Sequence, residues 1–301
     1  MKAIKRRRLT VKNISQITKA MNLVATSKLQ RARNALADVA DPVLATFNIT
    51  YNTISHPDVA DHPLINSDVA GNRAAYIVIT GNRGLCGGYN SNVCKEVIRH
   101  IKDHDKTPTI ITIGTKGRDY LKRRGYNITD YTPEGELDPQ HIVDTAVALY
   151  TSGQVDAVYI VYTKFVTVLN LTPITRKILP LDPSYLRTVL ADNLQAGEAW
   201  EDLGFFPMPE MAEGSGAEVE FEPDLPTVLE NVIPWYFTMF VHGAYISANL
   251  CEHAARMTSM DSSTKNAGEI IEKLTLQFNR QRQSIITQEI TEIVSGANAL
   301  E

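Results

Sequence analysis

Regular hydrophobic spacing first occurs in the sequence from about residue 3 to residue 55. Apolar residues recur in steps of three or four at Ile14, Ile17, Met21 and Val24, which is the spacing of one stripe on a helix. The other faces of this helix are basic or polar, and so narrow a seam is typical of a coiled coil. We therefore predict a long helix that packs against a second helix along this stripe.

The same stretch carries two further signals about packing. Small residues would let another helix approach closely, namely Ala25, Ala32 and Ala35, which precede Leu36. Pro42 lacks the backbone donor that a helix interior needs, so we expect a kink or a short break there.

A second long helix is predicted at the other end of the chain, from about Pro234 to Gly296. This segment contains no further proline and few glycines. Near its end, apolar residues again step by four and three, at Ile286, Ile290, Ile293, Ala297 and Leu300. Two long helices that each present a narrow seam can pair with one another, so the two ends of the chain are expected to form a coiled coil.

The middle of the chain alternates between short apolar runs and helical segments. Strands are predicted at residues 74–80, 109–113 and 155–166, and helices at residues 91–104, 116–124 and 142–151. This alternation predicts a parallel or mixed α/β sheet. Residues 56–73 read as a linker, and residues 192–226 as an exposed acidic insertion rich in glycine and proline.

The charges are distributed very unevenly along the chain. The net charge is −4, yet residues 1–37 hold ten Lys or Arg and no acid, and residues 188–255 hold no Lys or Arg at all. Such asymmetry implies charged partners. A basic helix could bind nucleic acid, form a transit peptide or face acidic protein partners. The first aromatic residue is Phe47, which disfavours single-strand binding, and the apolar stripe crosses the basic region, which disfavours a cleaved leader.

Candidate chemistry is sparse. The glycine-rich segment Thr80–Asn92 lies between a predicted strand and a predicted helix, where a loop can bind phosphate. Its glycines fit neither dinucleotide nor P-loop spacing, and no Lys-Ser or Lys-Thr follows, so a tight turn is favoured over a nucleotide site. No nucleophile–base motif is present, and we expect neither catalytic residues nor a cofactor.

The cysteines and histidines predict no metal site. Cys86, Cys94 and Cys251 have no metal-ligand spacing and an odd count, so we interpret them as reduced thiols in a cytoplasmic compartment. His100 and His104 are four residues apart on a predicted helix, but a solvated face is favoured over a metal pair. No apolar run approaches the roughly 20 residues that span a bilayer, so any membrane association would come through partners.

Four segments give the chain a family resemblance. Residues 17–29 (ITKAMNLVATSKL), 84–92 (GLCGGYNSN), 254–268 (AARMTSMDSSTKNAG) and 286–297 (ITQEITEIVSGA) resemble blocks of F-type ATP synthase γ subunits, in the same order. The resemblance implies an α/β fold class: a long antiparallel coiled coil of N- and C-terminal helices plus a Rossmann-like domain. The first helix of the coiled coil is expected at residues 1–55 and the last at residues 230–301. The α/β domain is expected at residues 74–190, and the acidic insertion at residues 192–226.

The resemblance also implies a function and a set of partners. Such a chain is a non-catalytic rotating shaft inside a head of α and β subunits, and its α/β domain touches the ε subunit and the membrane ring of c subunits. Lys19 and Met21 match positions that face an acidic β loop, and Arg282, Gln283 and Thr287 match a catch against β. A chain that starts directly at this helix is expected on the cytoplasmic side of a bacterial membrane.

The acidic insertion departs from the family pattern. It contains a short apolar island, Phe205, Phe206, Met208 and Met211. These four residues and Gln195 are the candidates for a regulatory role. Either it is an inert loop, or it is a latch that restrains ATP hydrolysis. Two rival functions also remain at this point, a coiled-coil nucleic-acid-binding protein and a nucleotide-dependent α/β enzyme.

Overall fold

The computed structural model describes residues 1–54, 56, 59, 62, 64–65, 71–133, 135–182 and 221–298. The chain divides into two compact units, one of residues 1–26 and 256–301, the other of residues 27–255. Two long helices, α1 (Lys2–Ile54) and α7 (Leu225–Asn298), contribute to both units. The five candidate regulatory residues of the acidic insertion, Gln195, Phe205, Phe206, Met208 and Met211, lie outside the described residues.

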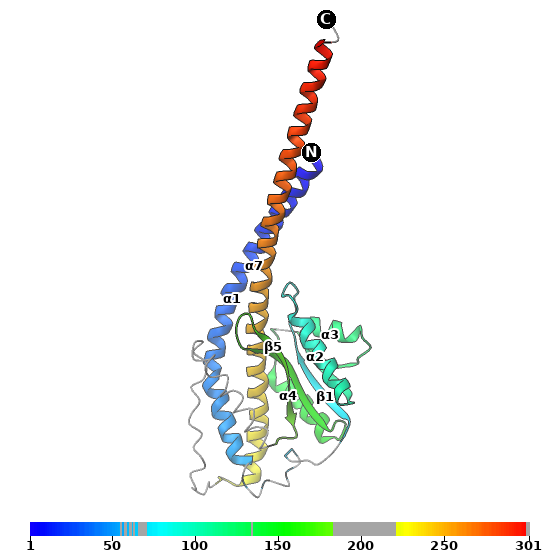
Figure 1. Ribbon diagram of the computed structural model, residues 1–301. Helices are drawn as coiled ribbons and strands as arrows, with labels where there is room; N and C mark the ends of the chain where they lie inside the picture. Colours follow the sequence, from blue (N-terminus) through cyan, green and yellow to red (C-terminus); the bar gives the residue numbers. More distant parts are fainter. Residues whose placement is uncertain are drawn as a thin grey trace. The chain divides into compact units, whose positions relative to one another are not determined.

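The larger unit is built on a five-stranded sheet in the order β3-β2-β1-β4-β5. Its strands are β1 (Arg73–Ile79), β2 (Thr107–Ile113), β3 (Ile128–Thr132), β4 (Ala157–Phe165) and β5 (Leu171–Leu179). Strands β1 and β5 of this sheet are labelled in Figure 1. The connecting helices are α2 (Tyr89–Asp103), α3 (Thr115–Lys122) and α4 (Pro139–Thr151). Strands β1 to β4 pair in parallel, and β5 pairs antiparallel with β4. This confirms the predicted mixed α/β sheet.

Alternate side chains of the sheet enter two separate cores. On β1, Ala75, Ile77 and Ile79 pack with residues of α1, α4 and α7, whereas Ala74, Tyr76 and Val78 pack with residues of α2 and α3. Both faces are therefore covered by helices, which explains why β1 reads as an unbroken apolar run rather than an alternating one. The sequence prediction missed β3 and β5, because neither edge strand is a continuous apolar run.

Of the kink or short break predicted at Pro42, the break does not occur, because helix α1 continues through this residue. Its packing against α7 within the larger unit accounts for this. The ring of Phe47 lies 4.9 Å from that of Tyr236 and 5.8 Å from that of Phe240, and a methyl group of Val43 lies close against Gly243. Tertiary contacts of this kind can outweigh the roughly 3 kcal/mol that proline costs inside a helix.

Helix α7 begins at Leu225, earlier than the predicted start near Pro234. The side chain of Asp224 accepts a hydrogen bond from the backbone N–H of Thr227 at 2.9 Å, which satisfies a donor that the helix itself leaves unpaired. Pro226 occupies the first turn, where a missing N–H costs little. The sequence Asp-Leu-Pro was thus the start signal that the prediction overlooked.

In the smaller unit, the first part of α1 packs against the last part of α7 along a seam of mixed polar and apolar side chains. Half-buried or buried positions of α1 recur in heptad steps at Ile4, Arg8, Val11, Ser15, Thr18, Asn22 and Ala25. The Thr18 and Thr264 hydroxyls lie 2.7 Å apart, and the amide of Asn22 donates to the Met257 carbonyl at 3.0 Å. The Arg8 guanidinium lies over the ring of Phe278. The two helices are therefore antiparallel, as expected.

The predicted seam residues were nevertheless wrong on both helices. Ile14, Ile17 and Val24 are exposed, and Met21 is only half-buried. On the part of α7 that belongs to this unit, the buried positions are Met260, Ala267 and Leu274, whereas Ile286, Ile290 and Ile293 are exposed. The prediction chose the most apolar stripe of each helix, but the helices meet along a mixed seam of apolar, small and polar side chains instead.

Candidate functional site: the outer face of the paired helices

Each helix of the smaller unit carries a row of apolar side chains that the packing of the unit does not use. We call these two rows together the outer stripe: Ile14, Ile17 and Val24 on α1, and, further along the rod, Ile286, Ile290 and Ile293 on α7. Ile17 is 59% exposed and Ile293 is 71% exposed. Single exposed apolar residues are ordinary, but a repeated row at helical spacing indicates a surface that other chains cover.

The isoleucines of α7 are exposed because α1 offers no partner at their level. Thr18 is opposite Thr264, and Arg8 is opposite Phe278. In this antiparallel pair, the numbers of two residues that face each other therefore add up to about 284. Lys2, the first residue of α1, therefore faces α7 near Arg282. Beyond that level, the described residues of α7 have no neighbouring helix within this unit.

The predicted contact residues on α1 lie on different sides of the helix: Met21 belongs to the row of Ile17 and Val24, whereas Lys19, two residues from Ile17, faces away from that row. Lys19 is exposed, and Met21 is half-buried beside the seam. None of the seven basic residues between Lys2 and Lys19 forms an ion pair with the described part of the chain. All of them except Arg8, which lies half-buried over Phe278, are exposed. These six charges are therefore available to acidic groups of another molecule, and such attraction weakens with salt.

The predicted catch residues on α7 border the same surface. Arg282, Gln283 and Thr287 are all exposed. On a helix, residues four apart lie on one face, so Arg282 continues the row of Ile286 and Ile290, while Gln283 and Thr287 form the next row. The arrangement offers hydrogen-bond donors at the margin of an apolar strip, as protein interfaces commonly do.

The two groups of predicted contact residues are not brought together. Thr264 lies opposite Thr18, next to Lys19. Arg282 is 18 residues further along α7, which corresponds to about 27 Å at the helical rise of 1.5 Å per residue. They are two separate contact levels on one rod, and they do not form a single pocket.

The glycine-rich loop between β1 and α2 forms a tight, internally bonded turn. Leu85 and Gly87 adopt positive φ values of 63° and 57°. The side chain of Asn90 accepts from the Gly81 N–H at 2.9 Å and donates to the Arg83 carbonyl at 3.2 Å. These contacts describe the turn that the sequence favoured.

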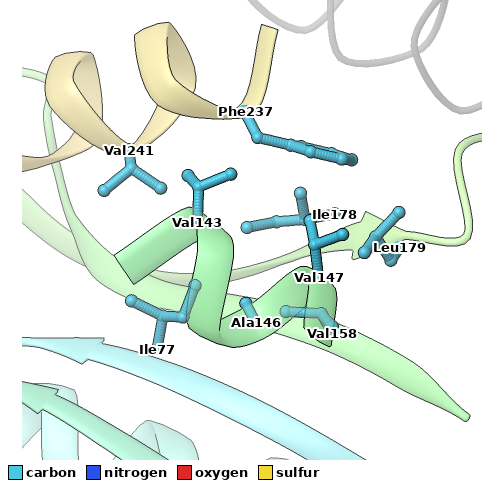
Figure 2. A pocket seen from close by; sticks show the side chains of 9 residues that line it. All are labelled: Ile77, Val143, Ala146, Val147, Val158, Ile178, Leu179, Phe237 and Val241. Atoms are coloured by element: carbon cyan, nitrogen blue, oxygen red, sulfur yellow. The ribbon is translucent and has the colours of Figure 1, made fainter. Parts of the chain in front are cut away.

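One cavity of the larger unit lies between the sheet, α4 and α7 (Figure 2). Its volume is about 10 Å³, and it is lined by apolar side chains only: Ile77, Val143, Ala146, Val147, Val158, Ile178, Leu179, Phe237 and Val241. A bound water needs two to four polar partners, and a nucleotide needs far more room. The cavity is a packing gap rather than a ligand site.

The histidine pair differs in part from its prediction. His104 is exposed, but His100 is half-buried. The hydroxyl of Tyr76 lies 2.9 Å from Nδ1 of His100, and the two histidine rings stack at 4.2 Å. Burial lowers the pKa of His100, with the neighbouring His104 adding to the effect. Within the described ranges, no three His, Cys, Asp or Glu side chains gather as metal ligands.

The comparisons with known proteins cover the whole chain. The family model described as ATP synthase matches residues 1–300. The ATP synthase gamma chain of Desulforamulus reducens is 37% identical over 303 residues, covering 99% of this chain and 98% of the relative. The gamma chain of Staphylococcus saprophyticus is 36% identical over 310 residues, covering 100% and 99%.

The chain belongs to the ATP synthase gamma chain family. It is therefore a central-stalk subunit of an F-type ATP synthase and carries no catalytic site. Family membership gives no support to the rival functions, nucleic-acid binding and a nucleotide-dependent enzyme. Among its described residues, the gamma chain has no helix both long enough and apolar enough to cross a membrane.

Solved structures agree on the fold of this gamma chain. A chain of the Euglena gracilis mitochondrial ATP synthase matches with a TM-score of 0.63 at 17% identity, covering 99% of this chain and 94% of that one. A chain of the Tetrahymena thermophila mitochondrial ATP synthase central stalk and c-ring matches with a TM-score of 0.59 at 20% identity, covering 82% and 98%. At these identities the likeness concerns architecture alone.

Proposed function

We propose that this chain turns as the shaft inside a head of α and β subunits and couples ion flow through a membrane ring to ATP synthesis or hydrolysis. The outer stripe is the observation that carries this proposal. The seam does not cover Ile17, and α1 does not reach the level of Ile290, so both side chains are exposed. A surrounding head that covers them would account for that arrangement, because burial of apolar surface stabilises assembly.

The proposed contacts with β are Lys19 and Met21 at one level and Arg282, Gln283 and Thr287 at the other. All but Met21 are exposed in the chain by itself. A rotating shaft must form and break its contacts repeatedly, and exposed ion pairs of about 0–1 kcal/mol suit that requirement. The exposed basic side chains of α1 therefore fit acidic loops that they pass in turn.

An exchange of one arginine tests the contact level on α7. Arg282→Ala should lower coupled ATP turnover of the assembled complex roughly tenfold, which is the loss expected from one charge-assisted hydrogen bond. Arg280→Ala is the matched control, because Arg280 is also exposed and lies two residues away, on a different face of α7. Equal turnover of the two variants would exclude the proposed catch.

We further propose that the α/β domain of the larger unit contacts the ε subunit and the ring of c subunits. The chain would then be peripheral, on the cytoplasmic side of a bacterial membrane, and held there by its partners. Copurification of the ring and ε with a tagged chain, lost when residues 74–190 are removed, would support this placement. Retention of both partners by the shortened chain would contradict it.

The acidic insertion is proposed as a latch that restrains ATP hydrolysis. Its composition supports this proposal: acids for basic groups on a partner, and Phe205, Phe206, Met208 and Met211 as an apolar island. Deletion of residues 195–211 should raise ATP hydrolysis by the assembled complex without impairing assembly. If the complex with the deletion hydrolyses ATP at the parental rate under all nucleotide conditions, the segment is an inert loop and not a latch.

A further inference from the structure

The crevice at which doubly wound sheets bind ligands is filled by the chain itself. In such sheets, ligands bind beyond the carboxyl ends of the strands, where neighbouring strands connect in opposite directions. Here that switch point lies between β1 and β4, because β2 follows on one side of β1 and β4 pairs on the other.

Helix α7 lies across the carboxyl ends of both strands. The Thr163 carbonyl of β4 accepts hydrogen bonds from Ser247 at 3.5 Å and from the Cys251 thiol at 3.3 Å. On the other side of the crevice, the hydroxyl of Tyr89, the first residue of α2, donates to the Ala248 carbonyl at 3.0 Å. One turn and a half of α7 therefore occupies the space that a ligand would need.

A carboxylate of this same turn lies against the glycine loop. Glu252 is 2% exposed, and the residue is not without an interaction partner. A methyl group placed on Gly81, just after β1, would come within 2.5 to 2.8 Å of the Glu252 carboxylate oxygens. Gly81 is thus required here because the carboxylate needs its backbone at close range.

We infer that Glu252 is a built-in anionic ligand of the glycine-rich loop, in the place where doubly wound sheets hold the anionic group of a bound molecule. The buried carboxylate excludes nucleotide phosphates by its charge and volume. It also fastens the loop, and through the loop the sheet, to α7. Glu252 is therefore a positioning residue, and the inference does not depend on the proposed contacts with the head.

Variants of the full chain separate the charge of Glu252 from its volume. Glu252→Gln keeps the volume and removes the charge, and we expect amide exchange in residues 81–88 to accelerate on the order of ten- to a hundredfold, as for loss of a charged hydrogen-bond partner. Glu230→Gln is the control, since Glu230 is an exposed acid on α7 in the same unit. It should leave exchange in the loop unchanged.

Chemical rescue then tests the ligand role directly. Glu252→Ala lacks the equivalent of one acetate molecule, so sodium acetate should raise the melting temperature of Glu252→Ala and restore exchange protection of residues 81–88. Sodium chloride at the same ionic strength should do neither, and acetate should not affect the wild type or Glu252→Gln. A merely space-filling side chain would show no such selectivity.

A double-mutant cycle tests the contact itself. Gly81→Ala should destabilise the wild type, whereas in the Glu252→Ala background most of that cost should vanish, because the added methyl no longer meets the carboxylate. Additive effects of Gly81→Ala and Glu252→Ala, or wild-type loop exchange in Glu252→Gln, or no effect of acetate, would each overturn the inference.

Discussion

Two leucines of α7 provide a direct test of which face of the coiled coil maintains the fold. Leu274 is 5% exposed in the seam between the two helices, whereas Leu276, two residues further on, is 54% exposed. Leu274→Ala removes buried apolar atoms and leaves a gap, which costs 2–5 kcal/mol in protein cores. A two-helix seam can partly close over the gap, so we expect about 2–3 kcal/mol.

The same truncation at Leu276 should cost little. Its side chain is largely in water in the chain by itself, and surface substitutions usually change stability by less than about 0.5 kcal/mol. The two variants have the same change in composition and lie on the same helix, so helix propensity and denatured-state effects nearly cancel.

Amide hydrogen exchange of residues 1–26 and 256–285 is the appropriate assay, because these residues form a compact unit apart from the sheet and exchange reports local opening. Leu274→Ala should accelerate exchange there by roughly 30- to 150-fold, corresponding to about 2–3 kcal/mol. Leu276→Ala should match the wild type. Equal acceleration in both variants would refute the assignment of seam and outer face, and with it the argument from the outer stripe.

Two further expectations concern buried and paired groups of the larger unit. Burial raises the pKa of the Cys94 thiol to about 12 and that of Cys251 well above its usual value, so neither should react with iodoacetamide at pH 8 until the chain is unfolded in urea. The hydrogen bond from Arg73 lowers the pKa of Asp156 below its usual 3.8, so this pair stabilises the fold above that pH. The stability difference between the wild type and Asp156→Asn should therefore shrink as the pH falls below 3.8.

The sequence predicted the broad architecture because its strongest signals are local. The runs at 74–80 and 109–113 are buried on both faces and read as strands, and the glycines after them mark turns. Edge strands such as β5, which contains Pro173, Arg176 and Lys177, carry no such signal. Their position depends on pairing with β4, which is a tertiary effect.

The coiled coil shows where apolarity alone misleads. Ile14 and Ile17 form the clearest stripe, yet Thr18 and Asn22 occupy the seam. The correct heptad is visible further along α1, where Leu29, Ala32, Leu36 and Val39 continue the same register and pack in the larger unit. Periodicity over the whole helix would have identified the seam, whereas the most apolar positions identified the outer stripe.

The seam also has a consequence for biosynthesis. The residues that meet at Thr18 and Thr264 are 246 positions apart. At about 5–20 residues per second, a ribosome makes the second partner roughly 12–50 seconds after the first. During that interval the basic amino-terminal helix is outside the ribosome, with its apolar side chains uncovered and no antiparallel partner. The coil is thus the last part of the chain able to form, and the nascent amino terminus is the segment that a chaperone or an early assembly partner has most time to meet.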